Sequence, residues 1–219
     1  MSETIRVFVG TDPRMGRAER VLEYSIRKHT ESPVEITWMR CGDPPLFDGW
    51  RGSAVLPYTR KNSQWATGFT CFRWTIPEQC NYEGYAIYLD VDMVLLGDIA
   101  GLYEYRKPGL WMATKSGVAV MVIDCAAGRA IPPIAELKDS TCQNNSLAGL
   151  VSVRKEIPMA WNQLDSLRAE TKLIHYTSMF TQPWKPWPER FRYPPHAHKA
   201  AAGLWFDYEQ EALAAENAA

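Results

Sequence analysis

The stretch Ala86–Ile99, AIYLDVDMVLLGDI, places two carboxylates one residue apart inside an almost unbroken apolar run. Such a run predicts a central strand of a mostly parallel sheet that is covered on both faces. In an extended chain Asp90 and Asp92 project to the same side, roughly 6–7 Å apart, while Val91 turns back into the protein. Burying ionised carboxylates is unfavourable unless a positive group meets them. The pair could therefore hold a divalent cation; the alternative is a strand end whose carboxylates are solvated or cap the next turn.

The composition favours a single α/β domain with a sizeable core. The chain has 219 residues, and its 24 Lys and Arg balance 25 Asp and Glu, so no net field would recruit nucleic acid or an anionic membrane. No leader-like or membrane-spanning apolar run is present, so we expect a cytoplasmic protein without a transmembrane segment, and peripheral membrane contact is left open. The five cysteines form no Cys-x-x-Cys pair and are expected to be reduced core thiols.

Hydrophobic periodicity predicts alternating strands and helices, which is typical of an α/β fold with a mostly parallel central sheet flanked by helices. Strands are expected at 4–10, 34–39, 109–115, 118–124 and 172–176, besides the strand that ends at Asp90. Helices are expected at 17–29, 64–74 and 208–215, and at 126–139 with an interruption at Pro132 and Pro133.

Three of the predicted strands end in polar clusters. Thr11 with Asp12, Asp90 with Asp92, and His175 with Tyr176 each lie where a strand ends. Because ligands bind beyond the carboxyl ends of the strands in open α/β sheets, these clusters form a candidate site. Asp12 has a second interpretation, because an aspartate before Pro13 is a good N-cap for the following helix. Neither a dinucleotide-binding glycine motif nor a phosphate-binding Walker A loop is present.

The stretch 182–195, QPWKPWPERFRYPP, cannot form an ordinary helix, because its prolines lack amide donors and restrict the residues before them. We expect an extended segment that wraps the domain. Its tryptophans either pack against the core or form an aromatic surface that touches a substrate.

Six short stretches together resemble a known family. They are VFVGTDPR (7–14), CFRWTIPE (71–78), IYLDVDMVLLGDI (87–99), SGV (116–118), WN (161–162) and LIHYTSMFTQPWKPW (173–187). Their order and spacing are similar to glycosyltransferase family 8, retaining nucleotide-sugar enzymes of the GT-A fold, over residues 5–187. The resemblance implies one domain over 1–219, with a nucleotide-binding half (1–124), a donor-sugar and acceptor half (125–187), and a tail with a final helix (188–219).

The resemblance also implies roles for individual residues. The metal ligands would be Asp90, Asp92 and His175. Donor contacts would come from Thr11, Asp12, Arg73, Asp90, Ser116 and Lys185. Catalytic roles would fall to Gln143 and Lys185. Arg73 could instead be an ordinary arginine on a surface helix, and His175 an ordinary partly buried histidine.

Three departures from the family pattern bear on these roles. Lys115 stands where an asparagine is usual, and Cys142-Gln143-Asn144 replaces an acidic segment that contacts the donor sugar. His175 and Lys185 are also further apart in the sequence than is usual. Retention could proceed by double displacement, for which Gln143 is the one nucleophile that the resemblance offers, or by exchange on one face of the sugar.

The chemistry of glycosyl transfer accounts for these residue types. Breaking a sugar–diphosphate bond leaves a negatively charged nucleotide, so the site must supply cations. Two carboxylates and a neutral imidazole suit Mn²⁺, with Mg²⁺ as the alternative. The expected reaction moves a hexose from a nucleotide sugar, most simply a UDP sugar, to a hydroxyl of a saccharide or other acceptor with retention. We expect no nucleic-acid partner.

Two other functions fit parts of the pattern. The apolar strand followed by Asp-x-Asp also fits the first motif of haloacid-dehalogenase-type phosphatases, with Asp90 as nucleophile and Asp92 as general acid. That motif usually follows the first strand of its fold, and the later acidic pair it needs is missing. The other alternative is a protein of the same fold that binds sugar nucleotides without turnover.

Overall fold

The computed structural model describes residues 3–50, 67–139, 147–189 and 191–218. A six-stranded sheet forms its centre, in the order β2-β1-β3-β6-β5-β7, and β6 alone runs opposite to the other five strands. The bounds are β1 (Ile5–Thr11), β2 (Val34–Arg40), β3 (Tyr85–Asp90), β5 (Trp111–Thr114), β6 (Gly117–Asp124) and β7 (Val153–Ile157). The predicted mostly parallel α/β sheet is therefore confirmed, with the Asp90 strand at its centre.

A second sheet has three strands, the first of which follows β3 directly along the chain. It contains β4 (Met93–Leu95), β9 (Leu173–His175) and β8 (Gln163–Leu164), in the order β4-β9-β8. The antiparallel register of β4 and β9 pairs Met93 with His175. Asp92 immediately precedes β4, and its carbonyl accepts a hydrogen bond of 2.8 Å from the Tyr176 amide. Backbone pairing between short strands therefore brings two distant polar clusters together.

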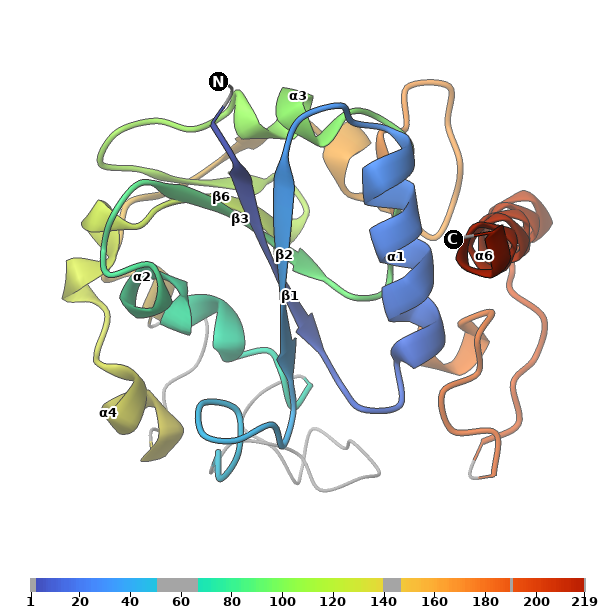
Figure 1. Ribbon diagram of the computed structural model, residues 1–219, viewed down its shortest axis with the longest axis horizontal. Helices are drawn as coiled ribbons and strands as arrows, with labels where there is room; N and C mark the ends of the chain where they lie inside the picture. The colour runs from blue at the N-terminus through green and yellow to red at the C-terminus, as the bar shows by residue number, and fades with distance from the viewer. Residues whose placement is uncertain (1–2, 51–66, 140–146, 190, 219) are drawn as a thin grey trace.

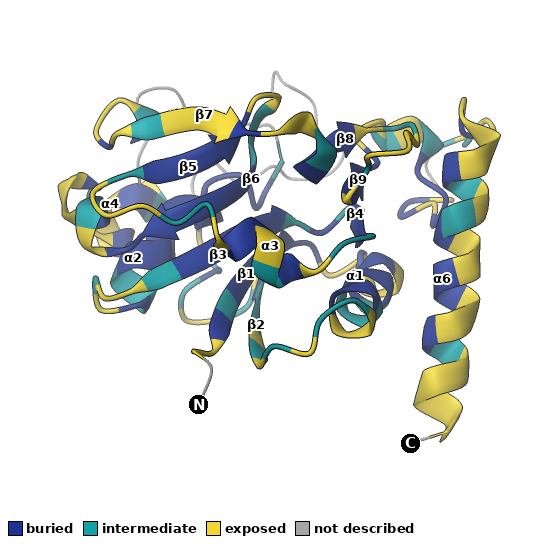
Figure 2. Cartoon of the chain, turned by 90° about the horizontal axis from the view of Figure 1, so that it is seen from above, coloured by how far each residue is buried: buried dark blue, intermediate teal, exposed yellow. Residues whose placement is uncertain are grey.

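Helices cover both sides of the central sheet, as Figures 1 and 2 show. Helix α1 (Gly16–Lys28) lies on one side, buries an apolar stripe that includes Val21, Leu22 and Ile26, and is covered in turn by α6 (Lys199–Ala218). On the other side lies α2 (Ile76–Gln79). The remaining helical segments are η1 (Phe72–Thr75), α3 (Ile99–Tyr103), η2 (Ala126–Ala130), α4 (Ile134–Asp139), η3 (Met159–Trp161) and η4 (Met179–Thr181).

Two of the predicted helices differ from the observed ones. Within the described part of 64–74, helical structure begins only at Phe72, and it continues past Pro77 to Gln79. Pro77 is tolerated because it stands in the first turn of α2, where its missing amide proton is not needed. The last helix begins at Lys199 rather than 208, because its alanine-rich start favours a helix without showing an amphipathic period. The break at Pro132 and Pro133 is confirmed, since it separates η2 from α4.

The Pro/Trp-rich segment packs onto the domain as an extended chain. Its described residues, 182–189 and 191–195, form no helix or strand. Trp184 and Trp187 are buried, which supports packing rather than an aromatic surface open to a substrate. Within the described ranges, no helix is both long and apolar enough to cross a membrane.

Candidate active site

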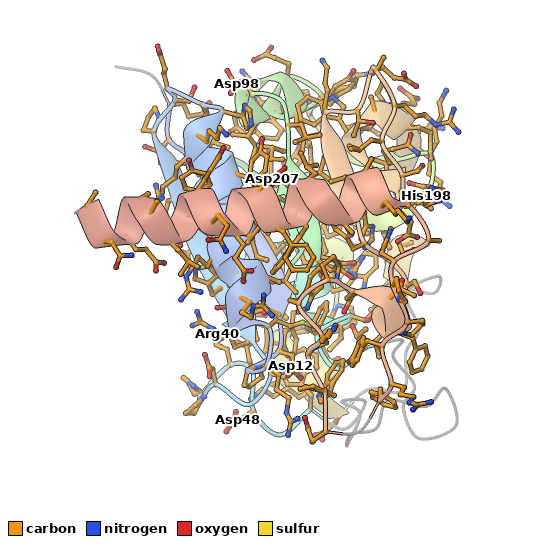
Figure 3. The ribbon with its side chains drawn as sticks, turned by 90° about the vertical axis from the view of Figure 1, so that its right-hand side faces the viewer. Asp12, Arg40, Asp48, Asp98, His198 and Asp207 are labelled. Atoms are coloured by element: carbon orange, nitrogen blue, oxygen red, sulfur yellow. The ribbon has the colours of Figure 1, made fainter. Side chains whose placement is uncertain are left out.

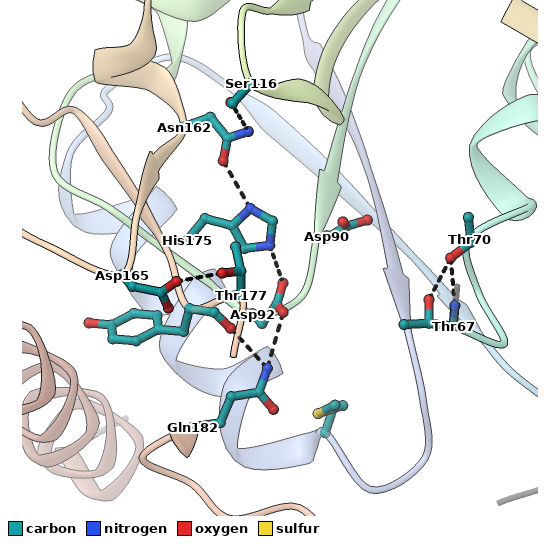
Figure 4. Close-up of polar contacts among 12 residues, drawn as sticks. Thr67, Thr70, Asp90, Asp92, Ser116, Asn162, Asp165, His175, Thr177 and Gln182 are labelled. Carbon is teal, nitrogen blue, oxygen red and sulfur yellow. Dashed lines mark hydrogen bonds and ion pairs between the residues drawn. The ribbon is translucent and has the colours of Figure 1, made fainter. Parts of the chain in front are cut away.

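Asp90, Asp92 and His175 form a group that could hold a metal ion. Each offers one ligand atom, and these atoms lie within 4.8 Å of one another. Asp90 ends β3, Asp92 precedes β4 and His175 ends β9, so the group lies where the two sheets meet (Figure 4). The Val91 side chain between the two aspartates is fully buried, as the alternation of an extended chain predicts.

The geometry around Asp92 fits a cation. Its Oδ1 lies 3.0 Å from His175 Nε2, yet Oδ1 is a buried atom without a hydrogen-bond partner among the described residues. The two atoms are therefore close without being aligned as donor and acceptor. Ligand atoms at right angles on an octahedral ion, with bonds of about 2.1 Å, are separated by about 3 Å. The other oxygen, Oδ2, accepts a hydrogen bond of 3.1 Å from Gln182 Nε2.

A chain of hydrogen bonds orients His175. Its Nδ1 lies 2.9 Å from Asn162 Oδ1, and Asn162 Nδ2 donates to Ser116 Oγ at 2.7 Å and to Thr114 Oγ1 at 3.1 Å (Figure 4). Because the Asn162 amide oxygen can only accept, His175 Nδ1 carries a proton, and Nε2 is the ring nitrogen that lies near Asp92. This is the arrangement that a metal-ligating imidazole needs.

Asp90 is held by two buried neighbours. Arg73 Nη2 donates to Asp90 Oδ1 at 3.1 Å, and the Tyr88 hydroxyl donates to the same oxygen. Arg73 also donates to the carbonyls of Thr70 and Val118, and its guanidinium lies over the Tyr88 ring. It is 3% exposed, so the interpretation of Arg73 as an ordinary surface arginine is wrong.

The electrostatics of the group favour an added positive charge. Burial raises the pKa of Asp90; Arg73 opposes this, whereas Asp92 adds to it. Burial is the largest influence on His175 and lowers its pKa, but the carboxylates of Asp92 and Asp90 together outweigh it, so the net shift is upward. Two carboxylates this close repel each other, and a cation between them would relieve that repulsion.

Thr11 and Asp12 lie at the end of β1, on the same edge of the sheet as Asp90. The buried Thr11 hydroxyl donates to Glu19 Oε1 at 2.8 Å. Asp12 Oδ1 accepts from the Arg14 amide at 3.1 Å. Capping of the next helix by Asp12 is wrong: α1 begins at Gly16, its N-cap is Met15, and no side chain caps it. The turn formed by Asp12 ends before the helix begins.

The remaining predicted residues are distributed as follows. Ser116 is exposed and joins the Asn162 chain, whereas Lys185 is exposed in a turn where its amide donates to the Gln182 carbonyl at 3.1 Å. Gln143 lies outside the described residues. The order of the strands gives no support to the phosphatase alternative, because the Asp-x-Asp pair follows β3 rather than the first strand.

Two residues of the site were missed by the sequence reasoning. Tyr88 stands two residues before Asp90 on the same strand and therefore faces the same side, a periodicity that could have identified it. Gln182 follows His175 by seven residues, and no local signal indicates its return to Asp92.

We compared the chain with protein families and with curated proteins. No protein-family model matches the chain. Protein CDI of Arabidopsis thaliana is 33% identical over 99 residues, which are 45% of this chain and 36% of that protein. The chain thus spans about a third of the length of this curated relative.

The solved structures it resembles are glycosyltransferases. GlyE of Streptococcus pneumoniae TIGR4 is similar with a TM-score of 0.61 and 17% identity, over 94% of this chain and 61% of that chain. The galactosyltransferase LgtC, in complex with donor and acceptor sugar analogs, gives a TM-score of 0.59 and 13% identity, over 95% of this chain and 96% of that chain. The chain therefore has the GT-A fold, as the sequence resemblance implied.

Proposed function

We propose that the chain is a metal-dependent glycosyltransferase similar to family 8. It would move a hexose from a nucleotide sugar, most simply a UDP sugar, to a hydroxyl of a saccharide or other acceptor, with retention. One observation carries this proposal: Asp90, Asp92 and His175 converge at the carboxyl end of β3 in a GT-A fold, with the histidine already oriented by Asn162. The kind of partner is supported by LgtC, whose structure contains donor and acceptor sugar analogs.

The metal would be held by Asp90, Asp92 and His175. Two carboxylates and an imidazole suit Mn²⁺, with Mg²⁺ as the alternative. The buried Asp92 Oδ1 has no hydrogen-bond partner in the described part of the chain, which supports a ligand at that atom. When bound, such an ion supplies positive charge that stabilises the departing diphosphate.

The chain's own residues would keep this centre rigid. Arg73 and Tyr88 restrain Asp90, Gln182 restrains Asp92, and Asn162 restrains His175. Ligands that are fixed before the reaction need no reorganisation when charge develops, which is the main source of electrostatic catalysis. The N–H groups of Arg73 already donate to protein acceptors. We therefore assign Arg73 to positioning Asp90, as well as to the positive potential near the nucleotide sugar.

The other predicted roles remain part of the proposal. Thr11 and Asp12 would contact the nucleoside, and Ser116 the donor sugar. Lys185 would stabilise the diphosphate, and Gln143 would act beneath the sugar ring. Because the Thr11 hydroxyl is bonded to Glu19, we assign any contact of Thr11 with the nucleoside to its backbone.

We also propose that the enzyme acts in the cytoplasm. The four described cysteines are free thiols, three of them buried, which supports a reducing compartment.

A thermal-shift screen of UDP-glucose, UDP-galactose, UDP-N-acetylglucosamine and GDP-mannose, with and without Mn²⁺, tests the proposal. A ligand that binds only the native state raises the melting temperature, so one nucleotide sugar should do so in Mn²⁺ but not in EDTA. Asp92→Asn should abolish this shift. Asp207→Asn, which alters an exposed aspartate on α6 (Figure 3), is the matched control and should leave it intact.

A shift that persists in EDTA or in Asp92→Asn would contradict the metal assignment. Hydrolysis of the bound sugar nucleotide, or transfer to an acceptor, would separate the enzyme from a non-catalytic binding protein. A protein that binds in Mn²⁺ yet never releases nucleotide, with any acceptor, would instead support the non-catalytic alternative.

A further inference from the structure

A cavity of about 410 Å³ lies between the Pro/Trp-rich segment and the start of α6. Figure 3 views the molecule from this side, with α6 crossing the face and His198 next to its first residue. The residues that line it include Tyr193, Phe206, Gln182, Lys185, Lys199 and Gly203. The volume is within the range of pockets that bind small molecules.

The cavity is positively charged. Lys185 lines it from the extended segment and Lys199 from α6, and no carboxylate is among the described residues that line it. Neither ammonium group makes a hydrogen bond or ion pair with any residue that the structure describes. His196 also lines the cavity, and its Nε2 lies 3.6 Å from Asp165 Oδ1, the carboxylate behind this wall. Two cations from different segments of the chain, without partners among the described residues, are suited to an anionic ligand.

Two of the residues that line the cavity do not suit their local backbone: one is a lysine where glycine would be favoured, and the other is a glycine where alanine would be favoured. Lys185 has a φ of +47°, a left-handed conformation that glycine adopts without strain and lysine does not. Gly203 is within α6, where alanine would be more stable, and a Cβ added there would meet nothing within 4 Å. The chain thus keeps a lysine where glycine suits the backbone, and a glycine where a side chain would enter the cavity. A requirement for both a cation and open space explains the two choices together.

We propose that this cavity binds a small molecule that combines a ring with a carboxylate or phosphate group. The aromatic and proline side chains would pack against the ring, and Lys185 and Lys199 would pair with the anion. None of Asp90, Asp92 and His175 lines the cavity, but it adjoins the proposed transferase centre: Gln182 lines the cavity and donates to Asp92 Oδ2, and Lys185 is the residue that the proposed function also assigns to the diphosphate. The proposal goes beyond glycosyl transfer, because binding here requires neither metal nor nucleotide.

Calorimetric titration of the full chain in EDTA tests the proposal with three probes. The three probes differ only at C6 of the sugar: phenyl β-D-glucuronide carries a carboxylate there, phenyl 6-phospho-β-D-glucoside carries a phosphate, and phenyl β-D-glucoside carries an uncharged hydroxyl. We expect at least one anionic probe to bind at least tenfold more tightly than the glucoside. The tighter of the two anions identifies the ligand as carboxylated or phosphorylated. Equal affinity for glucuronide, phosphoglucoside and glucoside, or no binding at about 10 mM probe, overturns the proposal.

Three variants locate the binding. Gly203→Leu should fill the cavity and abolish binding, while its melting temperature stays equal or rises, because leucine favours the helix more than glycine does. Lys199→Gln should lower the affinity for the anionic probe about tenfold. Lys155→Gln, at an exposed lysine on β7, should leave that affinity unchanged. Undiminished binding in a folded Gly203→Leu protein would place the probe elsewhere and overturn the proposal.

Discussion

One side-chain amide, that of Asn162, orients a proposed metal ligand. Asn162 accepts from His175 Nδ1 and so fixes which ring nitrogen faces Asp92. We predict that Asn162→Ala weakens Mn²⁺ binding by about 10- to 100-fold, the usual effect of removing a residue that orients a metal ligand. Calorimetric titration with Mn²⁺ measures this. Ser116→Ala removes only the outer end of the chain and should change Mn²⁺ affinity by less than about threefold. Equal affinities in wild type and folded Asn162→Ala would show that the asparagine does not orient a ligand.

Lys185 allows stability and catalysis to be separated at one position. Its left-handed backbone is strained, so Lys185→Gly should raise the free energy of unfolding by up to about 1 kcal/mol. If the ammonium stabilises the departing diphosphate, the same variant should slow transfer by about 10²–10³. Urea unfolding and steady-state nucleotide release measure the two effects. A more stable protein with normal turnover would remove Lys185 from the proposed catalytic machinery.

Residue by residue, the sequence predicted which polar groups lie together better than it predicted their contacts. Asp90, Asp92 and His175 could be grouped because each lies at the end of a predicted strand and strand ends share an edge, whereas the family resemblance implied that they bind a metal. The hydrogen-bond partner of Thr11 could not be predicted, because Glu19 reaches Thr11 only once α1 packs on β1. Arg40 from β2 in turn forms an ion pair with Glu19. Gln182 was hidden for the same reason: its contact with Asp92 depends on the path of the extended segment.

At the scale of elements, the extended segment acts as a strap that packs under α6. Trp184 donates to the Met15 sulfur, meets the Trp205 ring at 5.4 Å, and is 3% exposed. We predict that Trp184→Ala lowers the free energy of unfolding by about 3–5 kcal/mol, as buried aromatic truncations do. Urea unfolding measures the loss. At low temperature, where the variant remains folded, nucleotide affinity should stay near that of wild type. Reduced acceptor use with unchanged stability would restore the substrate-surface interpretation.

The α1–α6 contact should depend on pH. A hydrogen bond from Lys28 lowers the pKa of Glu211, and Tyr24 and His29 lower it further. A carboxyl group with a lowered folded-state pKa stabilises the fold above its unfolded-state pKa, about 4.3, and that contribution is lost as the pH falls through the folded-state value. Glu211→Gln should therefore cost about 0.2–1 kcal/mol above pH ~5 and progressively less as the pH falls through the lowered folded-state pKa, as monitored by thermal melts.

Glu170→Gln, at an exposed glutamate, serves as the control for this pH series and should match wild type throughout. If the difference in stability between Glu211→Gln and wild type persisted unchanged at low pH, the Glu211 side chain would contribute by packing rather than by charge.

The elements that the apolar pattern identified were long enough to show it. β1, β2 and α1 were predicted to within one or two residues, and β3 was predicted by its end at Asp90. β4 and β8 were not, because strands of three and two residues are too short to show a period, and they form only when β9 lies between them. This sheet, of which only β9 was predicted, positions His175, so the site's geometry depends on strand pairing that the local sequence does not show.

For the molecule as a whole, the site joins distant parts of the chain. Asp90 belongs to the central sheet, Asp92 and His175 to the small sheet, and Gln182 to the extended segment. A structure in which these parts moved independently could not keep ligand atoms within a few ångströms. The proposed chemistry therefore implies that the parts fold as one unit.

The core supports this view and leads to a last prediction. One hydrophobic cluster of buried side chains extends from Ile5 to Tyr208, so it includes the start of β1 and the middle of α6. If 1–219 is a single domain, urea should unfold it in one cooperative transition. Far-UV circular dichroism reports the helices and strands. Tryptophan fluorescence reports both the Trp74–Trp111 stack beside the central sheet and the Trp184–Trp205 pair under α6. The two midpoints should coincide. If fluorescence changed at lower urea than circular dichroism, the strap and α6 would be a separate unit, and Gln182 could release Asp92 without unfolding the sheet.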